Sequence, residues 1–335
     1  MKFLVTGSAG YIGGTFCFEA LKSGHEVFGI DNYVNSQPKV TKELSYRFNE
    51  KFTFSENSID DIVFLSELVD EFKPDCLFHF AALKSVSESE KNPSIYWKNN
   101  LQSTFNLVEA MRNSSSRKIV YSSSATVYGN GKNQPLKETD KLSATSVYGK
   151  TKVAIESYLN DCANSDLIDC VSLRYFNPVA SHEEKIIIED INNCPDNLMP
   201  RIIRAALNID QNIKIFGTDY PTRDGTGERD FIHISDLVRG HFEAFNFIQN
   251  EKGYHPFNLG TGSSVSVLEL INKFMEVNGV NIEYQLIGRR KGDIAISIAD
   301  AGKANRKLGW YALKDLSEMC RDSWFAFKEN YAIRK

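Results

Sequence analysis

The chain has 335 residues, of which 42% are hydrophobic and 24% are charged. These values are typical of a soluble globular protein, and the length suits one large domain or two. The formal net charge is −4 and no basic stretch is present, which argues against nucleic acid as a partner. The six cysteines show no CxxC or Cys/His spacing, so no metal site is predicted. The apolar run at the start is too short for a signal sequence or membrane helix, and we expect a cytoplasmic protein.

Short β-type runs alternate with amphipathic segments through the first half of the chain. The runs that predict strands are residues 2–6, 26–30, 51–55, 76–80, 118–123 and 169–175. The segments that predict helices are residues 12–22, 61–72, 94–113 and 149–163. Nearly continuous apolar strands that alternate with helices indicate an α/β fold whose parallel sheet is covered on both faces.

The pattern changes after about residue 176. There the sequence predicts helices near 198–208, 234–248, 266–278 and 312–329, a strand at 213–216 and a loop at 217–230. We interpret this half as a smaller mixed α/β lobe on the C-terminal edge of the sheet. The predicted domains are residues 1–176, to which segments of roughly 230–260 return, and residues 177–335.

A glycine-rich loop follows the first predicted strand and opens the first predicted helix. Its glycines are Gly7, Gly10 and Gly13, in the order GSAGYIG. The first permits a tight turn, the second lets the backbone approach a pyrophosphate, and the third allows the helix to pack closely on the strand. The free N–H groups at the start of the helix attract phosphate. This order predicts a dinucleotide site on a Rossmann-type, doubly wound parallel sheet.

Asp31 stands at the end of the second predicted strand. A carboxylate there accepts hydrogen bonds from an adenosine ribose and repels a 2′-phosphate. The next residues are Asn32 and Tyr33, so no arginine is adjacent. We therefore predict NAD as the cofactor rather than NADP.

Tyr148 and Lys152 lie four positions apart in the segment VYGKTK, which is predicted to be helical. That spacing puts both side chains on one face of a helix. A phenol is a poor base at neutral pH, but a neighbouring ammonium and the positive ring of an oxidised nicotinamide would lower its pKa. The YxxxK spacing also occurs by chance. Together with a dinucleotide loop, it predicts that Tyr148 is a base and Lys152 its partner.

Three serines end the fifth predicted strand in the segment YSSSATVYG. A serine nucleophile needs a histidine base and an acid. The chain has no GxSxG turn, and nothing in the sequence places a histidine as the base. We therefore interpret Ser124 as a hydrogen-bond donor to a reacting substrate oxygen.

With these motifs the chain resembles the extended short-chain dehydrogenase/reductase family and, within it, the UDP-galactose (UDP-glucose) 4-epimerases. The resemblance covers essentially the whole chain. It is carried by the segments TGSAGYIGG, DNYVNS, FHFAALKSVSES, YSSSATVYG, VYGKTK, LRYFNPVASH, PDNLMP, FGTDYPTRDGTGERDFIHISDL and GRRKGD.

The resemblance implies roles for individual positions. Tyr148 would be the catalytic base, Lys152 its electrostatic partner, and Ser124 the contact to the sugar hydroxyl. The other cofactor-binding positions would be Gly7, Gly10, Tyr11, Ile12, Gly13, Asp31, Asn32, Asn35, Ser36, Ser58, Ile59, Phe80, Ala81, Lys84, Asn99, Ser122 and Tyr175. The other substrate-binding positions would be Lys84, Phe176, Asn177, Asn197, Leu198, Lys214, Phe216, Arg229, Arg290, Asp293 and Ser297.

The implied reaction is a reversible inversion at carbon 4 of a UDP-hexose. Tyr148 would remove the 4-hydroxyl proton while tightly bound NAD takes the hydride, which leaves a 4-keto sugar anchored through UDP. The sugar would turn over, and hydride and proton would return on the other face. Binding energy would therefore rest on UDP, remote from the reacting carbon.

Two positions depart from the pattern that the resemblance implies. Ser58 stands where the family carries an aspartate against adenine, so we expect weaker adenine binding. Ser297 stands where a bulky tyrosine restricts the family to glucose and galactose. A small residue there predicts that UDP-GlcNAc and UDP-GalNAc are accepted as well.

Three alternatives remain. A nucleotide-sugar 4,6-dehydratase or a UDP-glucuronate decarboxylase would carry a carboxylate beside Ser124, where this chain has Ala125 and Thr126. A non-catalytic NAD-binding regulator would have no need of Tyr148 and Lys152. The resemblance also implies a homodimer built on the helices near 94–113 and 149–163, although an apolar helix face is more often simply core.

Overall fold

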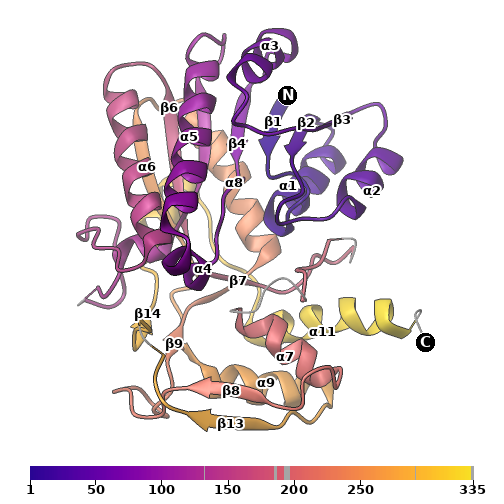
Figure 1. Ribbon diagram of the computed structural model, residues 1–335, viewed down its shortest axis with the longest axis vertical. Coiled ribbons are helices and arrows are strands. Elements are labelled where there is room, and N and C mark those ends of the chain that lie inside the picture. The colour runs from indigo at the N-terminus through magenta and orange to yellow at the C-terminus, as the bar shows by residue number, and fades with distance from the viewer. Residues whose placement is uncertain (132, 185–186, 192–196, 291, 333–335) are drawn as a thin grey trace.

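The computed structural model describes residues 1–131, 133–184, 187–191, 197–290 and 292–332. Its central feature is a seven-stranded sheet in the order β11-β6-β5-β4-β1-β2-β3, in which every neighbouring pair is parallel (Figure 1). The strands are β1 (Lys2–Thr6), β2 (Glu26–Asp31), β3 (Phe52–Glu56), β4 (Cys76–His79), β5 (Lys118–Ser124), β6 (Asp169–Tyr175) and β11 (Tyr254–Leu259).

Helices cover both faces of the sheet because its strands bury side chains in both directions. In β1, Phe3 and Val5 join one buried cluster and Leu4 joins another. The first cluster packs under α1 (Tyr11–Lys22), α2 (Lys39–Arg47), α8 (Ile234–Ile248) and α10 (Gly302–Leu308). The second packs under α3 (Ile62–Phe72), α5 (Pro93–Arg112) and α6 (Val147–Asn164). The result is the doubly wound Rossmann-type arrangement that the sequence predicts.

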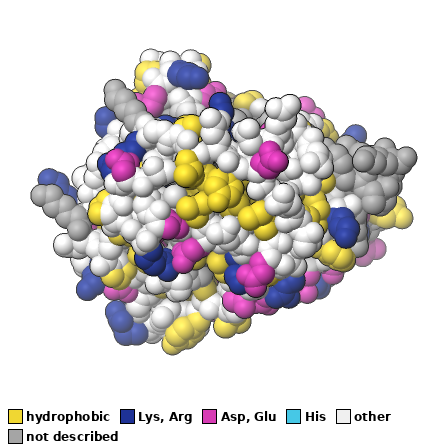
Figure 2. Space-filling view, turned by 90° about the horizontal axis from the view of Figure 1, so that it is seen from below, with side chains coloured by type: hydrophobic (Ala, Val, Ile, Leu, Met, Phe, Trp, Pro, Cys, Tyr) yellow, Lys and Arg dark blue, Asp and Glu magenta, His cyan; other side chains and the backbone are white. Residues whose placement is uncertain are grey.

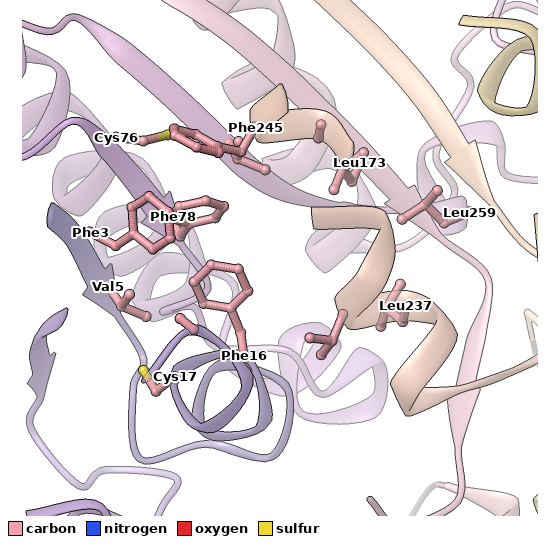
Figure 3. Packing of buried hydrophobic residues seen from close by; sticks show 14 of the residues in the cluster. Phe3, Val5, Phe16, Cys17, Cys76, Phe78, Leu173, Leu237, Phe245 and Leu259 are labelled. Carbon is pink, nitrogen blue, oxygen red and sulfur yellow. The ribbon is translucent and has the colours of Figure 1, made fainter. Parts of the chain in front are cut away.

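Aromatic side chains hold α1 and α8 against the sheet (Figure 3). The ring of Phe16 on α1 lies 4.1 Å from that of Phe78 on β4, and Phe3 on β1 meets Phe245 on α8 edge-to-face at 4.9 Å. Aromatic pairs in such geometry add to the free energy gained by burying their area. Because α1 begins at the glycine-rich loop, this packing also fixes the loop at the end of β1.

The second half of the chain builds a smaller lobe below the carboxyl ends of the strands (Figure 1). It contains a buried cluster of its own, formed largely by α7, α9 and α11. A group of hydrophobic side chains is visible on its outer face, with charged ones around it (Figure 2). The elements are β7 (Asn177–Val179), α7 (Leu198–Ala206), β8 (Ile213–Phe216), β9 (Glu228–Arg229), β10 (Phe231–His233), β12 (Val265–Ser266), α9 (Val267–Asn278), β13 (Tyr284–Ile287), β14 (Ile296–Ser297) and α11 (Leu316–Ala332).

All six strands and four helices predicted for the first half are present, with ends that differ by one or two residues. Strand β11 and helix α2 were not predicted, nor was the short helix α4 (Val86–Lys91). The last helix begins at Leu316 rather than near 312. In the described part of the chain, no helix is both long and apolar enough to cross a membrane.

Candidate active site

A cavity of about 1420 Å³ opens at the carboxyl ends of the strands. Its walls include the segments that follow β1, β2, β4, β5 and β6 and, from the lobe, residues of α7, β8 and β9. In a parallel sheet, this edge is where loops from several strands converge on a ligand. Every site residue that the sequence predicts, except Ser297, lines this cavity.

The glycine-rich loop is built so tightly that side chains are excluded at two of its positions. Gly7 has a φ of +72°, and a Cβ added there would lie 2.7 Å from the amide nitrogen of Ala81. A Cβ on Gly13 would lie 2.2 Å from the carbonyl oxygen of Gly7. Gly10 caps α1 without a side-chain hydrogen bond, so no side chain competes there for the first amides of the helix. This loop fits the pyrophosphate of a dinucleotide.

The carboxylate of Asp31 is held firmly at the end of β2. It accepts hydrogen bonds from the backbone N–H of Ala9 at 3.0 Å, from that of Tyr33 at 2.9 Å, and from the Ser36 hydroxyl at 2.8 Å. Although Asp31 is buried, it still lines the cavity. An adenosine ribose above the glycine loop therefore meets an oriented anion, which fits NAD and repels a 2′-phosphate.

Tyr148 and Lys152 lie on one face of α6, as their spacing predicts. The helix starts where the Ser146 side chain accepts the N–H of Gly149 at 3.0 Å. The Lys152 ammonium donates to the carbonyl oxygen of Ser122 at 2.7 Å and lies 5.8 Å from the Tyr148 ring centre. The Ser124 hydroxyl lies close enough to the Tyr148 phenol to lower its pKa. Four polar groups thus meet at the end of β5.

Burial shifts the pKa values of both members of this pair. Burial raises the pKa of Tyr148 to about 12, although the hydrogen bond from Ser124 opposes the rise. Burial also lowers the pKa of Lys152 to about 7. In the protein alone, burial therefore dominates the pKa of Tyr148. The predicted lowering of this pKa involves Lys152 together with the positive nicotinamide ring, and it stays a prediction.

Thr126 is a site residue whose role the sequence did not indicate. Its backbone N–H and its hydroxyl both donate to Ser124 Oγ, at 3.2 and 3.0 Å. Because Ser124 Oγ accepts both bonds, its own hydrogen is left to donate to a further oxygen. Thr126 is also part of the cavity wall.

Replacing Thr126 with valine should lower kcat roughly 2- to 10-fold, the value of one hydrogen bond that orients Ser124. Thr126→Ser keeps the hydroxyl and is expected to behave like the wild type. Steady-state kinetics with a UDP-hexose measure kcat for both variants and the wild type. If the valine and serine variants have equal kcat, the hydroxyl of Thr126 has no orienting role.

Charged and aromatic residues line the lobe side of the cavity. Arg290 lies 3.0 Å from Asp293, and its guanidinium lies 5.4 Å from the ring centre of Phe216. Arg229 is partly buried and also lines the cavity. Arginine pairs well with a diphosphate, since its planar fork can make two bonds at once. The other predicted substrate residues in the wall are Lys84, Ser124, Tyr148, Phe176, Asn177, Asn197, Leu198 and Lys214.

Ser297 lies beside the cavity but is not among the residues that line it. It is 7% exposed on β14, directly opposite Arg229 on β9. Its carbonyl oxygen accepts the N–H of Asp230 at 3.0 Å. Ser297 is thus a buried neighbour of a cavity residue rather than part of the wall.

Ser58 lines the cofactor side of the cavity, and its hydroxyl accepts the N–H of Asp60 at 3.2 Å. A hydroxyl is a weaker acceptor than a carboxylate. Ser58→Asp is therefore expected to slow NAD loss roughly tenfold, the value of a hydrogen bond to a charged group. The rate of NAD release after dilution measures this, with Ser58→Asn as the uncharged control. An aspartate variant that releases NAD no more slowly than the asparagine variant would contradict the expectation.

Comparison with known proteins agrees with this geometry. Residues 3–260 match the model of the NAD dependent epimerase/dehydratase family. A UDP-glucose 4-epimerase of Bacillus subtilis is 44% identical over 97% of this chain and 96% of that protein, and one of Dictyostelium discoideum is 41% identical over 96% and 94%.

Solved structures of UDP-glucose 4-epimerases are also similar to this chain over nearly its full length. A UDP-glucose 4-epimerase of Stenotrophomonas maltophila, described with bound NAD and formylated UDP-arabinopyranose, is 41% identical and superposes with a TM-score of 0.96 over 99% of both chains. One from Bifidobacterium longum, in complex with NAD+ and UDP, is 37% identical with a TM-score of 0.93 over 99% of both chains. These similarities agree with a site that contains the glycine loop, the oriented Asp31 and the Tyr148–Lys152 pair. The chain belongs to the NAD-dependent epimerase/dehydratase family.

Proposed function

We propose that this chain is an NAD-dependent UDP-glucose 4-epimerase, which interconverts UDP-glucose and UDP-galactose. The observation that carries the proposal is the meeting of Ser124, Tyr148 and Lys152 in one cavity with a dinucleotide loop. Full-length similarity to several UDP-glucose 4-epimerases supports it.

The glycine loop and Asp31 would hold the pyrophosphate and adenosine ribose of NAD, with Lys152 near the nicotinamide half. When bound, NAD supplies a hydride acceptor and donor for carbon 4 of the sugar, together with a positive charge beside Tyr148. That charge, together with Lys152, is expected to lower the pKa of the buried phenol. Arg229, Arg290 and their neighbours in the lobe would hold the UDP part of the substrate.

The residues of this chain then handle the proton. Tyr148 Oη takes the proton of the 4-hydroxyl and later returns it on the opposite face of the sugar. Ser124 donates a hydrogen bond to the oxygen on carbon 4, and Lys152 stabilises the phenolate. UDP stays anchored while the hexose turns over, so the site needs firm contacts at the nucleotide and loose ones at the sugar.

Elimination and decarboxylation are disfavoured by the side chains beside Ser124. A dehydratase needs a base for the C5 proton and an acid for the leaving 6-hydroxyl. The two residues that follow Ser124 are Ala125 and Thr126, and neither is a carboxylic acid. Thr126 instead donates to Ser124, which suits oxidation and re-reduction at one carbon.

We further propose that UDP-N-acetylhexosamines are accepted, because Ser297 is small where it lies against Arg229. Ser297→Tyr would push a ring from this buried strand toward the sugar end of the cavity. We expect it to lower kcat/KM for UDP-GalNAc at least about tenfold relative to UDP-Gal. Parallel assays of both substrates test this, with Ser297→Ala as the small control. Wild-type enzyme that turns over UDP-Gal but not UDP-GalNAc would contradict the wider specificity.

The same proposal includes the division into domains, a homodimer and a cytoplasmic location. Residues 1–176, joined by segments of roughly 230–260, would form the NAD-binding domain, and most of 177–335 the UDP-sugar lobe. Strand β11 and helix α8 support this division because both pack on the main sheet. Exposed Ile95 and Trp97 on α5 are compatible with a homodimer of a cytoplasmic enzyme.

The test of the proposed function is incubation of the purified protein with UDP-galactose and NMR measurement of the anomeric protons. The proposal predicts an equilibrium mixture with UDP-glucose and no other product. Accumulation of a 4-keto-6-deoxy sugar would favour the dehydratase, and NAD binding without turnover would favour the regulator.

A further inference from the structure

A buried ion pair lies behind Tyr148 and Lys152, on the same side of α6. Glu156 follows Lys152 by four positions, and its carboxylate binds the guanidinium of Arg174 on β6. The Nη2–Oε2 distance is 2.6 Å and the Nε–Oε1 distance is 3.1 Å, with the side chains 4% and 3% exposed. Neither residue lines the cavity. Any effect on the reaction must therefore pass through another residue.

Glu156 also connects α6 to the end of β5 through hydrogen bonds. The Ser123 hydroxyl donates to Glu156 Oε1, and the Tyr254 hydroxyl on β11 donates to Oε2 at 2.9 Å. Ser123 stands between Ser122, whose carbonyl oxygen accepts from Lys152, and Ser124. One carboxylate thus sets the distance between the helix that carries the base and the strand that carries its hydrogen-bond partners.

Glu156 is also the charged group that favours the ammonium form of Lys152. The titratable groups facing Lys152 are His79 from β4, Tyr121 from β5, and Tyr148 and Glu156 from its own helix. Burial lowers the pKa of His79 to about 3 and raises the pKa of both phenols, so all three are neutral at pH 7. Burial lowers the pKa of Lys152 to about 7, and Glu156 opposes that effect.

Arg174 has partners besides Glu156. Its Nη1 donates to the Tyr128 hydroxyl at 2.9 Å and to the carbonyl oxygen of Glu138 at 3.2 Å. The field of Arg174 also lowers the pKa of the Glu138 carboxyl, although burial has the larger, opposite effect. Arg174 therefore keeps hydrogen-bond acceptors when Glu156 is changed.

We propose that Glu156 is a positioning residue of the reaction. It fixes the Ser122–Ser124 strand end against α6 and favours the ammonium form of Lys152, while Arg174 is its ion-pair partner. This inference rests on the proposed function, because Lys152 matters to catalysis only as the partner of the base. It distinguishes Glu156 from a purely structural ion pair, because Glu156 is the member whose charge favours the ammonium form of Lys152, which the like charge of Arg174 cannot do.

The experiment follows the Lys152 side chain directly. Protein labelled with ¹³C at lysine Cε is titrated by NMR, and the Lys152 signal is assigned from its absence in Lys152→Arg. Three variants are compared with the wild type: Glu156→Gln, Arg174→Gln and the double variant. Glu156→Gln leaves a buried cation and risks unfolding, whereas removing both charges is usually tolerated. The double variant thus keeps the proposal testable.

We expect the Lys152 titration to move down by about one pH unit in Glu156→Gln and in the double variant, because the nearby anion is lost. Arg174→Gln should leave it unchanged or move it up. At pH values above the wild-type midpoint, kcat relative to the wild type should fall about tenfold for each pH unit by which the midpoint has moved. KM for the UDP-hexose should stay as in the wild type, since Glu156 lies outside the cavity.

Equal titrations of Lys152 in the wild type and the double variant would overturn the proposal. So would downward movements of equal size in Glu156→Gln and Arg174→Gln, the pattern of a merely structural pair. The titration does not require turnover. Wild-type protein without epimerase activity would therefore refute the proposed function and still leave the Glu156 inference to be decided by NMR.

Discussion

Tyr148→Phe is expected to lower kcat roughly 10²- to 10⁴-fold, the usual contribution of a positioned acid–base group. The phenol is buried, Ser124 is near enough to lower its pKa, and its ring lies 5.8 Å from the Lys152 ammonium. Phenylalanine keeps the ring and removes only the oxygen that carries the proton. Pre-steady-state and steady-state kinetics with UDP-galactose measure the loss.

The sign of the pH dependence follows from the same side chain. Burial raises the pKa of Tyr148, so protonation disables the base at low pH. The rate of the wild type should therefore rise with pH as the phenol ionises in the complex, up to the pH at which Lys152 loses its proton, whereas the residual rate of Tyr148→Phe should lack this rise. UDP affinity, measured by calorimetry, is the control and should be unchanged. A phenylalanine variant with wild-type kcat would remove Tyr148 from the chemistry.

Gly13→Ala is expected to weaken NAD binding about 10- to 100-fold, which corresponds to about 1–3 kcal/mol of backbone strain at a functional turn. The added Cβ would lie 2.2 Å from the carbonyl oxygen of Gly7, and this neighbour is backbone that cannot rotate away. Either the loop opens or α1 moves, and both displace the amides that face the pyrophosphate. NAD content after gel filtration and NAD titration of the stripped protein measure the effect.

Gly288→Ala is the matched control for that substitution. A Cβ at Gly288 would meet nothing within 4 Å, so the same chemical change carries no clash. The control should keep its NAD and its melting temperature. If Gly13→Ala retains NAD as well as Gly288→Ala does, the close approach of α1 to the loop is not needed for cofactor binding.

The sequence predicts the strands of the sheet that are continuous apolar runs. It does not predict β11, which is not such a run. Strand β11 has the sequence YHPFNL and contains Pro256. A proline inside a run usually argues against a strand, because it cannot donate to the ladder. β11 lies at the edge of the sheet, where one side of the strand needs no partner. Helix α2 was missed because it buries only Thr41 and Leu44 and so has no apolar stripe.

The members of the site were predictable, whereas their energetics were not. Residues adjacent in a motif stay adjacent in space, so the glycine loop could be found from its spacing and its place after a strand, and the Tyr148–Lys152 pair from its spacing together with that loop. The hydrogen bonds from Thr126 to Ser124 and from Tyr254 to Glu156 depend on turns and strands that spacing does not define. The pKa values of Tyr148 and Lys152 depend on burial, which only the folded chain determines.

The most direct test of the central claim uses UDP-galactose labelled with deuterium at carbon 4. If carbon 4 is oxidised and re-reduced within one site, NMR and mass spectrometry of the UDP-glucose product should find the deuterium at carbon 4, undiluted by solvent. Deuterium at carbon 6 of a deoxy sugar, or its replacement by solvent hydrogen at carbon 4, would contradict the assignment of this chain as a 4-epimerase.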